Sequence, residues 1–229
     1  MVLQTFRSGL CKAFTLIELL TVVAVILVLA RIMLPVVSRT RYDAKNAACI
    51  SNLHQWGIAV TLYANDNQRM LPRFDLCSGN NTWDISSFFL PAMRQYGITE
   101  KQWVCPVDTR RPEEIIRWMD AYADFAQNPH MQLFEYCWWV PRRCGAILFP
   151  PGYPTSLSDP SVSTLPIMSD SMGNPGNEPT DVQLVARWNM HNWNRRILNT
   201  NILFADAHVE QVPASGIKNR YDGNWHNYH

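Results

Sequence analysis

The chain has 229 residues, enough for one domain or two small ones, and a formal net charge of +1 at pH 7. That charge balance gives no electrostatic basis for binding a nucleic acid. Hydrophobic residues make up 47% of the sequence and charged residues 17%, and the apolar share is concentrated in the first forty residues. This composition excludes a disordered chain and a multi-pass membrane protein, and favours a globular protein with one apolar anchor.

An apolar segment spans residues 14–37, a length that crosses a bilayer as a helix. Four polar residues interrupt it: Thr15, Glu18, Thr21 and Arg31. A secretory signal, cleaved after Ala30, or a plain membrane anchor would account for the apolar run. Neither accounts for Glu18, because a carboxylate in hydrocarbon is costly and normally has a partner or a mechanism. Basic residues flank the run on both sides, so charge alone does not orient it.

The stretch KAFTLIELLTVVAVILVLARIMLP, residues 12–35, resembles the N-terminus of the type IV pilin and type II secretion pseudopilin superfamily. In that family a dedicated peptidase removes a short basic leader, and the new N-terminal amine is methylated. The resemblance implies cleavage between Ala13 and Phe14, although Gly is usual where this chain has Ala13. It implies that Glu18 neutralises the N-terminal ammonium of a neighbouring subunit in the filament, where an unpaired charge would be very costly. Pro35 matches the proline that commonly interrupts the pilin helix.

The helical pattern continues beyond the apolar segment, and one helix is predicted from about Phe14 to Asp66. Its second half carries larger apolar residues at three- and four-residue steps: Cys49, Leu53, Trp56, Val60 and Tyr63. This spacing predicts one buried face, interpreted as core without any ligand. The chain is thus expected to divide into a prepilin leader, a transmembrane and assembly helix, an amphipathic second half of that helix and a globular pilin-like domain, at residues 1–13, 14–37, 38–66 and 67–229.

Three further segments resemble a large pilin-like subgroup: residues 46–72, with the Cys-x-x-Asn-Leu helix, the Cys-Pro segment at residues 103–108, and the closing hairpin at residues 201–212. The subgroup has Asp-Gly where this chain has Asp206-Ala207. Alanine is penalised at positive φ, so the turn is expected either to be of another type or to be strained.

In the globular part, short helices are predicted at residues 86–96 and 112–128, and loops at 150–161 and 171–181. Six strands are predicted from apolar and β-branched runs, at residues 102–105, 134–140, 165–169, 183–188, 202–205 and 209–212. The expected fold class is α+β and pilin-like: one long N-terminal helix packed on a small antiparallel sheet, with variable loops.

The chain has six cysteines and none lies in a C-x-x-C pair. Two disulfides are candidates, Cys137–Cys144 and Cys77–Cys105, and reduced, buried cysteines are the alternative. No metal-ligand spacing is recognised; calcium is a further candidate, because Asp159, Asp170 and Asp181 are expected in loops. No catalytic motif is present, so the chain is predicted not to be an enzyme. A trio such as Cys137, His191 and Asp206 is expected by chance.

The resemblance implies a structural subunit of a type II secretion pseudopilus or type IV pilus-like filament, with no cofactor and no nucleic acid. Its expected partners are prepilin peptidase/methyltransferase, further copies of itself, other pilins or pseudopilins, and the bacterial inner membrane. It is expected to cross that membrane once, with the domain on the extracytoplasmic side, before it enters the filament. The alternatives are a membrane-anchored extracytoplasmic binding protein or enzyme, and a minor tip adhesin with a ligand-binding, Trp-rich middle.

Overall fold

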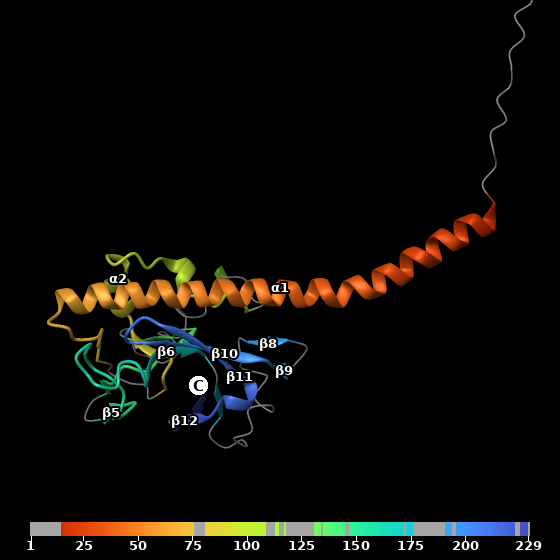
Figure 1. Cartoon of the computed structure of the whole chain (residues 1–229). Coiled ribbons are helices and arrows are strands. Elements are labelled where there is room, and N and C mark those ends of the chain that lie inside the picture. The colour runs from red at the N-terminus through yellow and green to blue at the C-terminus, as the bar shows by residue number, and fades with distance from the viewer. Residues whose placement is uncertain are drawn as a thin grey trace, which may run out of the picture. The chain divides into compact units, whose positions relative to one another are not determined.

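The computed structural model describes residues 15–75, 81–108, 113–114, 117, 131–133, 135–144, 147–171, 173–175, 191–193, 196–222 and 225–228. The chain forms two compact units, Met1–Asp43 and Ala44–His229. Helix α1 runs without a break over Leu16–Asp66, 51 residues (Figure 1), so the boundary between the units falls inside it. The long N-terminal helix predicted from the sequence is therefore confirmed over the residues that are described.

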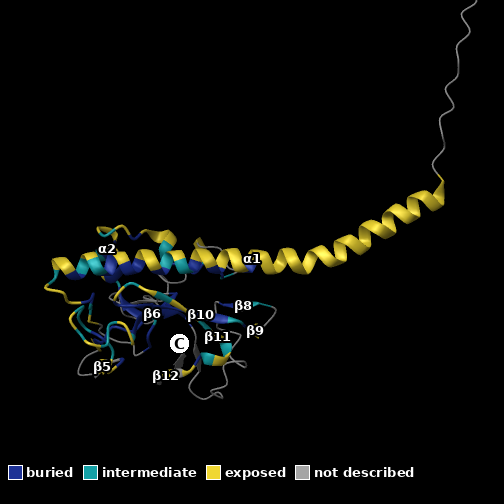
Figure 2. Cartoon of the chain, viewed as in Figure 1, coloured by how far each residue is buried: buried dark blue, intermediate teal, exposed yellow. Residues whose placement is uncertain are grey.

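The first half of α1 is exposed along its whole length (Figure 2). Large hydrophobic residues from Leu16 to Val37 are all exposed, and the most apolar 18-residue window has a mean hydropathy of 2.7. The helix is long and apolar enough to cross a membrane. It continues through Pro35, which has no N–H to donate to the carbonyl one turn earlier.

The second half of α1 has the predicted buried face. Cys49, Leu53, Trp56 and Val60 are each 0% exposed. Between them, Gly57 lies so close to the sheet that a Cβ there would be 3.0 Å from the Cβ of Ala207 and 3.0 Å from the Cδ1 of Leu203. The glycine is needed for this close approach, because a side chain would displace its neighbours.

The core of the globular unit is a four-stranded antiparallel sheet with the strand order β11-β10-β6-β3. Its strands are β3 (Tyr136–Trp138), β6 (Pro166–Asp170), β10 (Asn199–Phe204) and β11 (Val209–Pro213). The two central strands, β6 and β10, are buried along their whole length, whereas β11 is largely exposed. A long helix with a small antiparallel sheet is the α+β layout that the sequence predicted, and strands near 134–140, 165–169, 202–205 and 209–212 are confirmed.

Smaller elements surround this sheet. Two-stranded pairs are formed by β1 (Asp84–Ser86) with β2 (Met131–Leu133), β4 (Arg142–Cys144) with β5 (Ile147–Phe149), and β8 (Asn192–Trp193) with β9 (Arg196–Ile197). A three-stranded sheet has the order β12 (Asn219–Asp222), β13 (Trp225–Tyr228), β7 (Gly173–Pro175). The short helices are α2 (Phe89–Arg94) and the 3₁₀ turns η1 (Glu100–Gln102) and η3 (Ala214–Gly216).

Some sequence predictions need correction. The strand predicted at residues 102–105 is wrong: Gln102 ends η1 and a turn follows. A capping box between Thr99 and Gln102 starts that 3₁₀ turn, and the indole of Trp56 donates to the carbonyl of Gln102 at 2.9 Å. These polar contacts override the apolar run. The helix predicted at 86–96 is shorter, and β7 lies inside the loop predicted at 171–181.

Other predictions fall largely outside the described residues. Within the helix predicted at 112–128, residues 113, 114 and 117 are helical and the rest is not described. The strand predicted at 183–188 is not described at all. The loop predicted at 150–161 is confirmed as a series of turns, joined to the segment that follows α1 by a bridge between Met70 and Ser156.

The sequence left two alternatives for the turn between β10 and β11, another turn type or a strained alanine. The structure shows the strained alanine. Ala207 has a φ of 70°, in the left-handed region that disfavours a side chain. Its N–H donates to the carbonyl of Phe204 at 3.0 Å, and the Phe204 N–H donates to the carbonyl of His208 at 3.0 Å. Tight hydrogen bonding thus holds alanine in a conformation better suited to glycine.

Candidate functional site

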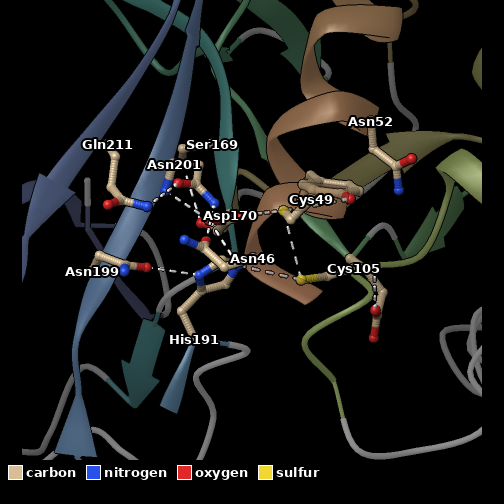
Figure 3. Close-up of polar contacts among 12 residues, drawn as sticks. Asn46, Cys49, Asn52, Cys105, Ser169, Asp170, His191, Asn199, Asn201 and Gln211 are labelled. Carbon is tan, nitrogen blue, oxygen red and sulfur yellow. Dashed lines mark hydrogen bonds and ion pairs between the residues drawn. The ribbon is translucent and has the colours of Figure 1, made fainter. Parts of the chain in front are cut away.

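Four chemically reactive side chains meet in the core of the globular unit: Cys49, Cys105, Asp170 and His191 (Figure 3). Each is 0% exposed. Their sulfur, nitrogen and carboxylate oxygen atoms all lie within 4.8 Å of one another. Such a concentration of ionisable groups in an apolar core is costly and needs compensating contacts.

Each of the four residues comes from a different element. Cys49 lies on the buried face of α1, and Asp170 is the last residue of β6. Cys105 follows the turn after η1, where its N–H donates to the buried carboxylate of Glu135 at 3.1 Å. His191 immediately precedes β8. The site therefore forms only when the helix, the central sheet and two connecting segments have come together.

The contacts within the cluster are short. The Cys49 thiol donates to Asp170 Oδ1 at 2.9 Å, and the two sulfur atoms of Cys49 and Cys105 are 3.8 Å apart. His191 Nε2 lies 3.4 Å from Cys105 Sγ and 3.0 Å from Asp170 Oδ2. Four different ligand atoms thus face one small volume.

A second layer of amide groups surrounds the cluster. Asn199 Oδ1 is 2.9 Å from His191 Nδ1, so Nδ1 carries a proton and Nε2 is directed at the cluster. The Asn201 N–H donates to Asp170 Oδ2 at 2.6 Å. The Asn201 side chain in turn donates to Asn46 Oδ1 at 2.9 Å. These contacts fix the orientation of both the imidazole and the carboxylate.

The cluster strongly perturbs its own ionisation. Burial raises the pKa of the Cys49 thiol well above its usual range, and the neighbouring Cys105 and Asp170 add to this. Burial also opposes ionisation of Cys105, but the hydrogen bond with Cys49 and the positive charge of His191 outweigh it and lower the pKa of Cys105 to about 6. Burial disfavours the His191 imidazolium, yet the negative charges of Asp170 and Cys105 raise its pKa well above the usual value. The cluster therefore favours ionisation of the Cys105 thiol and protonation of the His191 imidazole.

The order Cys105, His191, Asn199 has the hydrogen-bonding sequence of a nucleophile, a base and an orienting amide. Both Cys105 and His191 are completely buried, so a substrate cannot reach the sulfur in this conformation. The trio Cys137, His191 and Asp206 does not come together. His191 contacts Cys105 and Asp170, whereas Asp206 pairs with His208 in an exposed turn. The donor set instead consists of atom types that transition metals bind.

Neither candidate disulfide is tested by the described residues. Cys77 is not among them, and Cys105 lies beside Cys49 with neither residue in a disulfide. Cys137 lies in β3, which pairs with β6, whereas Cys144 lies in β4, which pairs with β5. The side chain of Cys144 is outside the described part. The pairs Cys137–Cys144 and Cys77–Cys105 stay predictions.

The acidic residues considered for calcium have other roles where they are described. Asp159 accepts hydrogen bonds from the N–H and the hydroxyl of Ser161 at 2.9 and 2.6 Å, closing a local turn. Asp170 belongs to the buried cluster, whose sulfur and imidazole groups are not ligands that calcium favours. Asp181 lies outside the described residues.

At the start of α1, Glu18 makes a local contact that was not predicted from the sequence. Glu18 Oε2 accepts hydrogen bonds from the N–H and the hydroxyl of Thr15 at 2.9 and 2.7 Å, while the Glu18 N–H donates to Thr15 Oγ1 at 3.3 Å. This reciprocal pair is a capping box, and Thr-Leu-Ile-Glu is its sequence signature. Ala13 and Phe14 are outside the described residues.

The buried cluster was missed at the level of sequence because its members are far apart. Cys49 and Asp170 are separated by 121 residues, and Cys105 and His191 by 86, so no local ligand motif exists. The available signal was weak: a cysteine on the buried face of a helix, a second in the Cys-Pro segment and an isolated histidine. No family model, curated protein or solved structure matches this chain.

Proposed function

We propose that this protein is a structural subunit of a type II secretion pseudopilus or a related type IV pilus-like filament. Prepilin peptidase cuts between Ala13 and Phe14, the new amine is methylated, and subunits assemble through the first half of α1. Before assembly the same segment holds the protein in the inner membrane, with the domain on the extracytoplasmic side. The observation that carries the proposal is the exposed apolar first half of α1, residues 16–37, whose one acidic residue, Glu18, lies within the first turn of the helix.

An apolar surface of this extent requires a cover. Every large hydrophobic side chain from Leu16 to Val37 is exposed, which in water would drive association. Lipid covers such a surface in a membrane, and neighbouring helices cover it in a filament core. The resemblance of residues 12–35 to pilin N-termini favours a subunit that uses both environments in succession.

The capping box is compatible with a role for Glu18 between subunits. A carboxylate has about four lone-pair sites, and Thr15 directs two donors at one of its oxygens, Oε2. The remaining capacity is sufficient for the ammonium group of a neighbouring chain. We infer that Glu18 first caps its own helix and then, in the filament, also pairs with the adjacent N-terminus.

Mass spectrometry of the N-terminus of protein purified from its native membrane is the direct test of processing. A mature chain that begins with N-methylated Phe14 is the expected result. A chain that begins at Arg31 would identify a secreted domain, and an intact leader would identify a plain membrane anchor. Either of these two results overturns the proposal.

The charge of Glu18 is tested separately from its capping role. Glu18→Gln keeps a side chain that can complete a capping box but removes the charge, so membrane insertion is expected to continue while assembly is lost. Thr15→Val is the matched control, because it removes the capping hydroxyl and leaves the carboxylate. Assembly is measured as filament recovered by shearing, or as crosslinked oligomers of a pseudopilus. Normal assembly of Glu18→Gln would contradict the proposed pairing.

A further inference from the structure

We propose that Cys49, Cys105, Asp170 and His191 bind one structural zinc ion in the core of the globular domain. The proposal does not depend on the filament function, because it rests on residues of the globular unit alone. No metal-binding motif in the sequence indicates it, and it arises only from the folded arrangement in Figure 3.

The ligand types are the first argument. Two thiolates, an imidazole nitrogen and a carboxylate oxygen are the groups that zinc takes in proteins. The two sulfur atoms favour a soft or borderline metal over magnesium or calcium, which prefer oxygen alone. Four protein ligands complete a tetrahedral shell, the arrangement of structural rather than catalytic zinc sites.

The geometry is the second argument. Zinc–sulfur bonds of about 2.3 Å and zinc–nitrogen or zinc–oxygen bonds of about 2.0 Å give tetrahedral edges of roughly 3.8 Å between sulfurs, 3.5 Å from sulfur to nitrogen or oxygen and 3.3 Å from nitrogen to oxygen. The two sulfurs are 3.8 Å apart, and Cys105 Sγ is 3.4 Å from His191 Nε2. His191 Nε2 is 3.0 Å from Asp170 Oδ2, and Cys49 Sγ is 2.9 Å from Asp170 Oδ1. The two carboxylate contacts, which are made by different oxygens, are shorter than these edges, so the carboxylate has to withdraw by about half an ångström. The other pairs of ligand atoms lie within 4.8 Å of one another.

The second layer is the third argument. A zinc-bound histidine normally donates its other N–H to an oxygen, which fixes the ring and its tautomer. Asn199 Oδ1 accepts from His191 Nδ1 at 2.9 Å, leaving Nε2 directed at the cluster. The Asn201 N–H holds Asp170 Oδ2 at 2.6 Å. Both non-sulfur ligands are thus oriented by the backbone or side chain of β10.

Burial and charge are the fourth argument. All four ligands are 0% exposed, and their metal-binding forms carry three negative charges in total, two on sulfur and one on the carboxylate. Such a charge in a core is unfavourable without a cation, and a divalent ion removes most of it. Because the ligands come from α1, the β6 end and two separate connecting segments, the ion crosslinks the domain, and its binding energy contributes to folding.

A Cys49–Cys105 disulfide is the competing arrangement of these residues in an oxidising compartment. It would require the sulfurs to approach from 3.8 Å to about 2.05 Å. It would also remove both sulfur partners from the buried Asp170 and His191, leaving two polar groups less well satisfied. The structure therefore favours a metal over a disulfide. With a metal the two cysteines stay reduced, whereas with a disulfide they are oxidised and the protein holds no metal there.

Metal content is the first test. Full-length protein purified in detergent, without added metal or chelator, is expected to contain about one zinc per chain by inductively coupled plasma mass spectrometry. Cys105→Ser and His191→Gln are expected to lose most of it, while Cys137→Ser, a buried cysteine of β3 outside the cluster, keeps it. Full zinc occupancy in both ligand variants would overturn the proposal. So would metal-free wild-type protein with a Cys49–Cys105 disulfide in its peptide map.

A second measurement guards against variants that fail to fold. Wild-type protein stripped with a chelator and loaded with Co²⁺ is expected to show thiolate-to-cobalt charge transfer and the intense visible bands of a tetrahedral site. Zinc should abolish both, and it should raise the thermal midpoint of the stripped protein. Asn199→Ala, which leaves all four ligands in place, should lower the affinity for zinc roughly 10- to 100-fold. Absence of the cobalt bands in folded wild-type protein would overturn the proposal.

Discussion

The two halves of α1 follow one after the other in a single helix, yet their side chains differ in exposure and in how far away along the sequence their contacts lie. In the first half, apolar side chains are exposed all round, and Glu18 finds its hydrogen-bond donors three residues away in Thr15. In the second half, Cys49, Leu53 and Trp56 are fully buried. Cys49 meets Cys105 and Asp170, which are 56 and 121 residues away in the sequence.

This difference shows which contacts give the domain its stability. The first half of α1 is a helix that local contacts and apolar composition are sufficient to specify, with its apolar surface left for lipid or for other helices. The second half is part of a core built from distant segments. Substitutions in the core should therefore lower the free energy of unfolding of the domain, and equivalent substitutions in the first half should not.

The largest effect is expected at Arg142, whose side chain is 1% exposed. Its guanidinium donates to the carbonyls of Asp84 at 2.7 Å, Trp138 at 2.8 Å and Asn81 at 3.0 Å. It thereby ties β4 to β3 and to the segment around β1. Arg142→Met leaves these buried carbonyls without their charged donor, so the free energy of unfolding should fall by about 5 kcal/mol.

Urea unfolding of the full-length protein in detergent, followed by tryptophan fluorescence, measures this loss. Arg143→Met is the matched control, because Arg143 is the next residue of β4 and is exposed. Its effect should stay within about 0.5 kcal/mol. Equal effects of the two substitutions would mean that the buried hydrogen bonds of Arg142 do not stabilise the domain.

A pair of leucines in α1 tests the comparison directly. Leu53 is 0% exposed and Leu27 is 64% exposed. Leu53→Ala removes buried methyl groups and leaves a cavity, so the free energy of unfolding should fall by about 3 kcal/mol. Leu27→Ala should leave domain stability unchanged while the segment remains apolar enough for the membrane. A similar loss for both, in the same urea titration, would show that the two halves of the helix do not differ in this way.

The features that could be predicted from the sequence are likewise those that depend on local patterns. The helix, its exposed apolar half and the stripe that includes Leu53 and Trp56 were all predicted, because periodicity is a local signal. The central strands were also found, because runs such as Ile202–Phe204 are strongly β-forming. The capping box of Thr15 and Glu18 is local too, and its signature Thr-x-x-Glu stands in the sequence, but it lies inside an apolar run, where a carboxylate also suggests a partner in another chain.

The buried cluster around Cys49 and the turn after η1 were not predictable in this way. Cys49 lies on a helical stripe that any apolar residue would occupy, and its partners are separated from it by whole elements of structure. The run ending at Cys105 has strand-like composition, but Gln102 is held in a 3₁₀ turn by Thr99 and by the indole of Trp56. In both cases long-range packing, which no local pattern encodes, decides the outcome.

The smallest expected effect concerns the contact of Gly57 in α1 with Ala207 in the β10–β11 turn. A Cβ on Gly57 would lie 3.0 Å from both the Ala207 Cβ and the Leu203 Cδ1, so the neighbours must shift. Gly57→Ala should lower the free energy of unfolding by about 1–2 kcal/mol, despite the better helix propensity of alanine. Ala207→Gly should raise it by up to about 1 kcal/mol, since Ala207 has a φ of 70°.

Combining the two substitutions shows whether the effects share one contact. Ala207→Gly removes the methyl group that the new side chain at position 57 would meet, so Gly57→Ala should be less costly in that background. Some cost should remain, because Leu203 Cδ1 and the Ala207 backbone lie at 3.0 and 3.1 Å from the same point. A coupling of zero in this double-mutant cycle would mean that the helix and the turn adjust independently. The cost of a side chain at position 57 would then come from its other neighbours and not from the methyl group of Ala207.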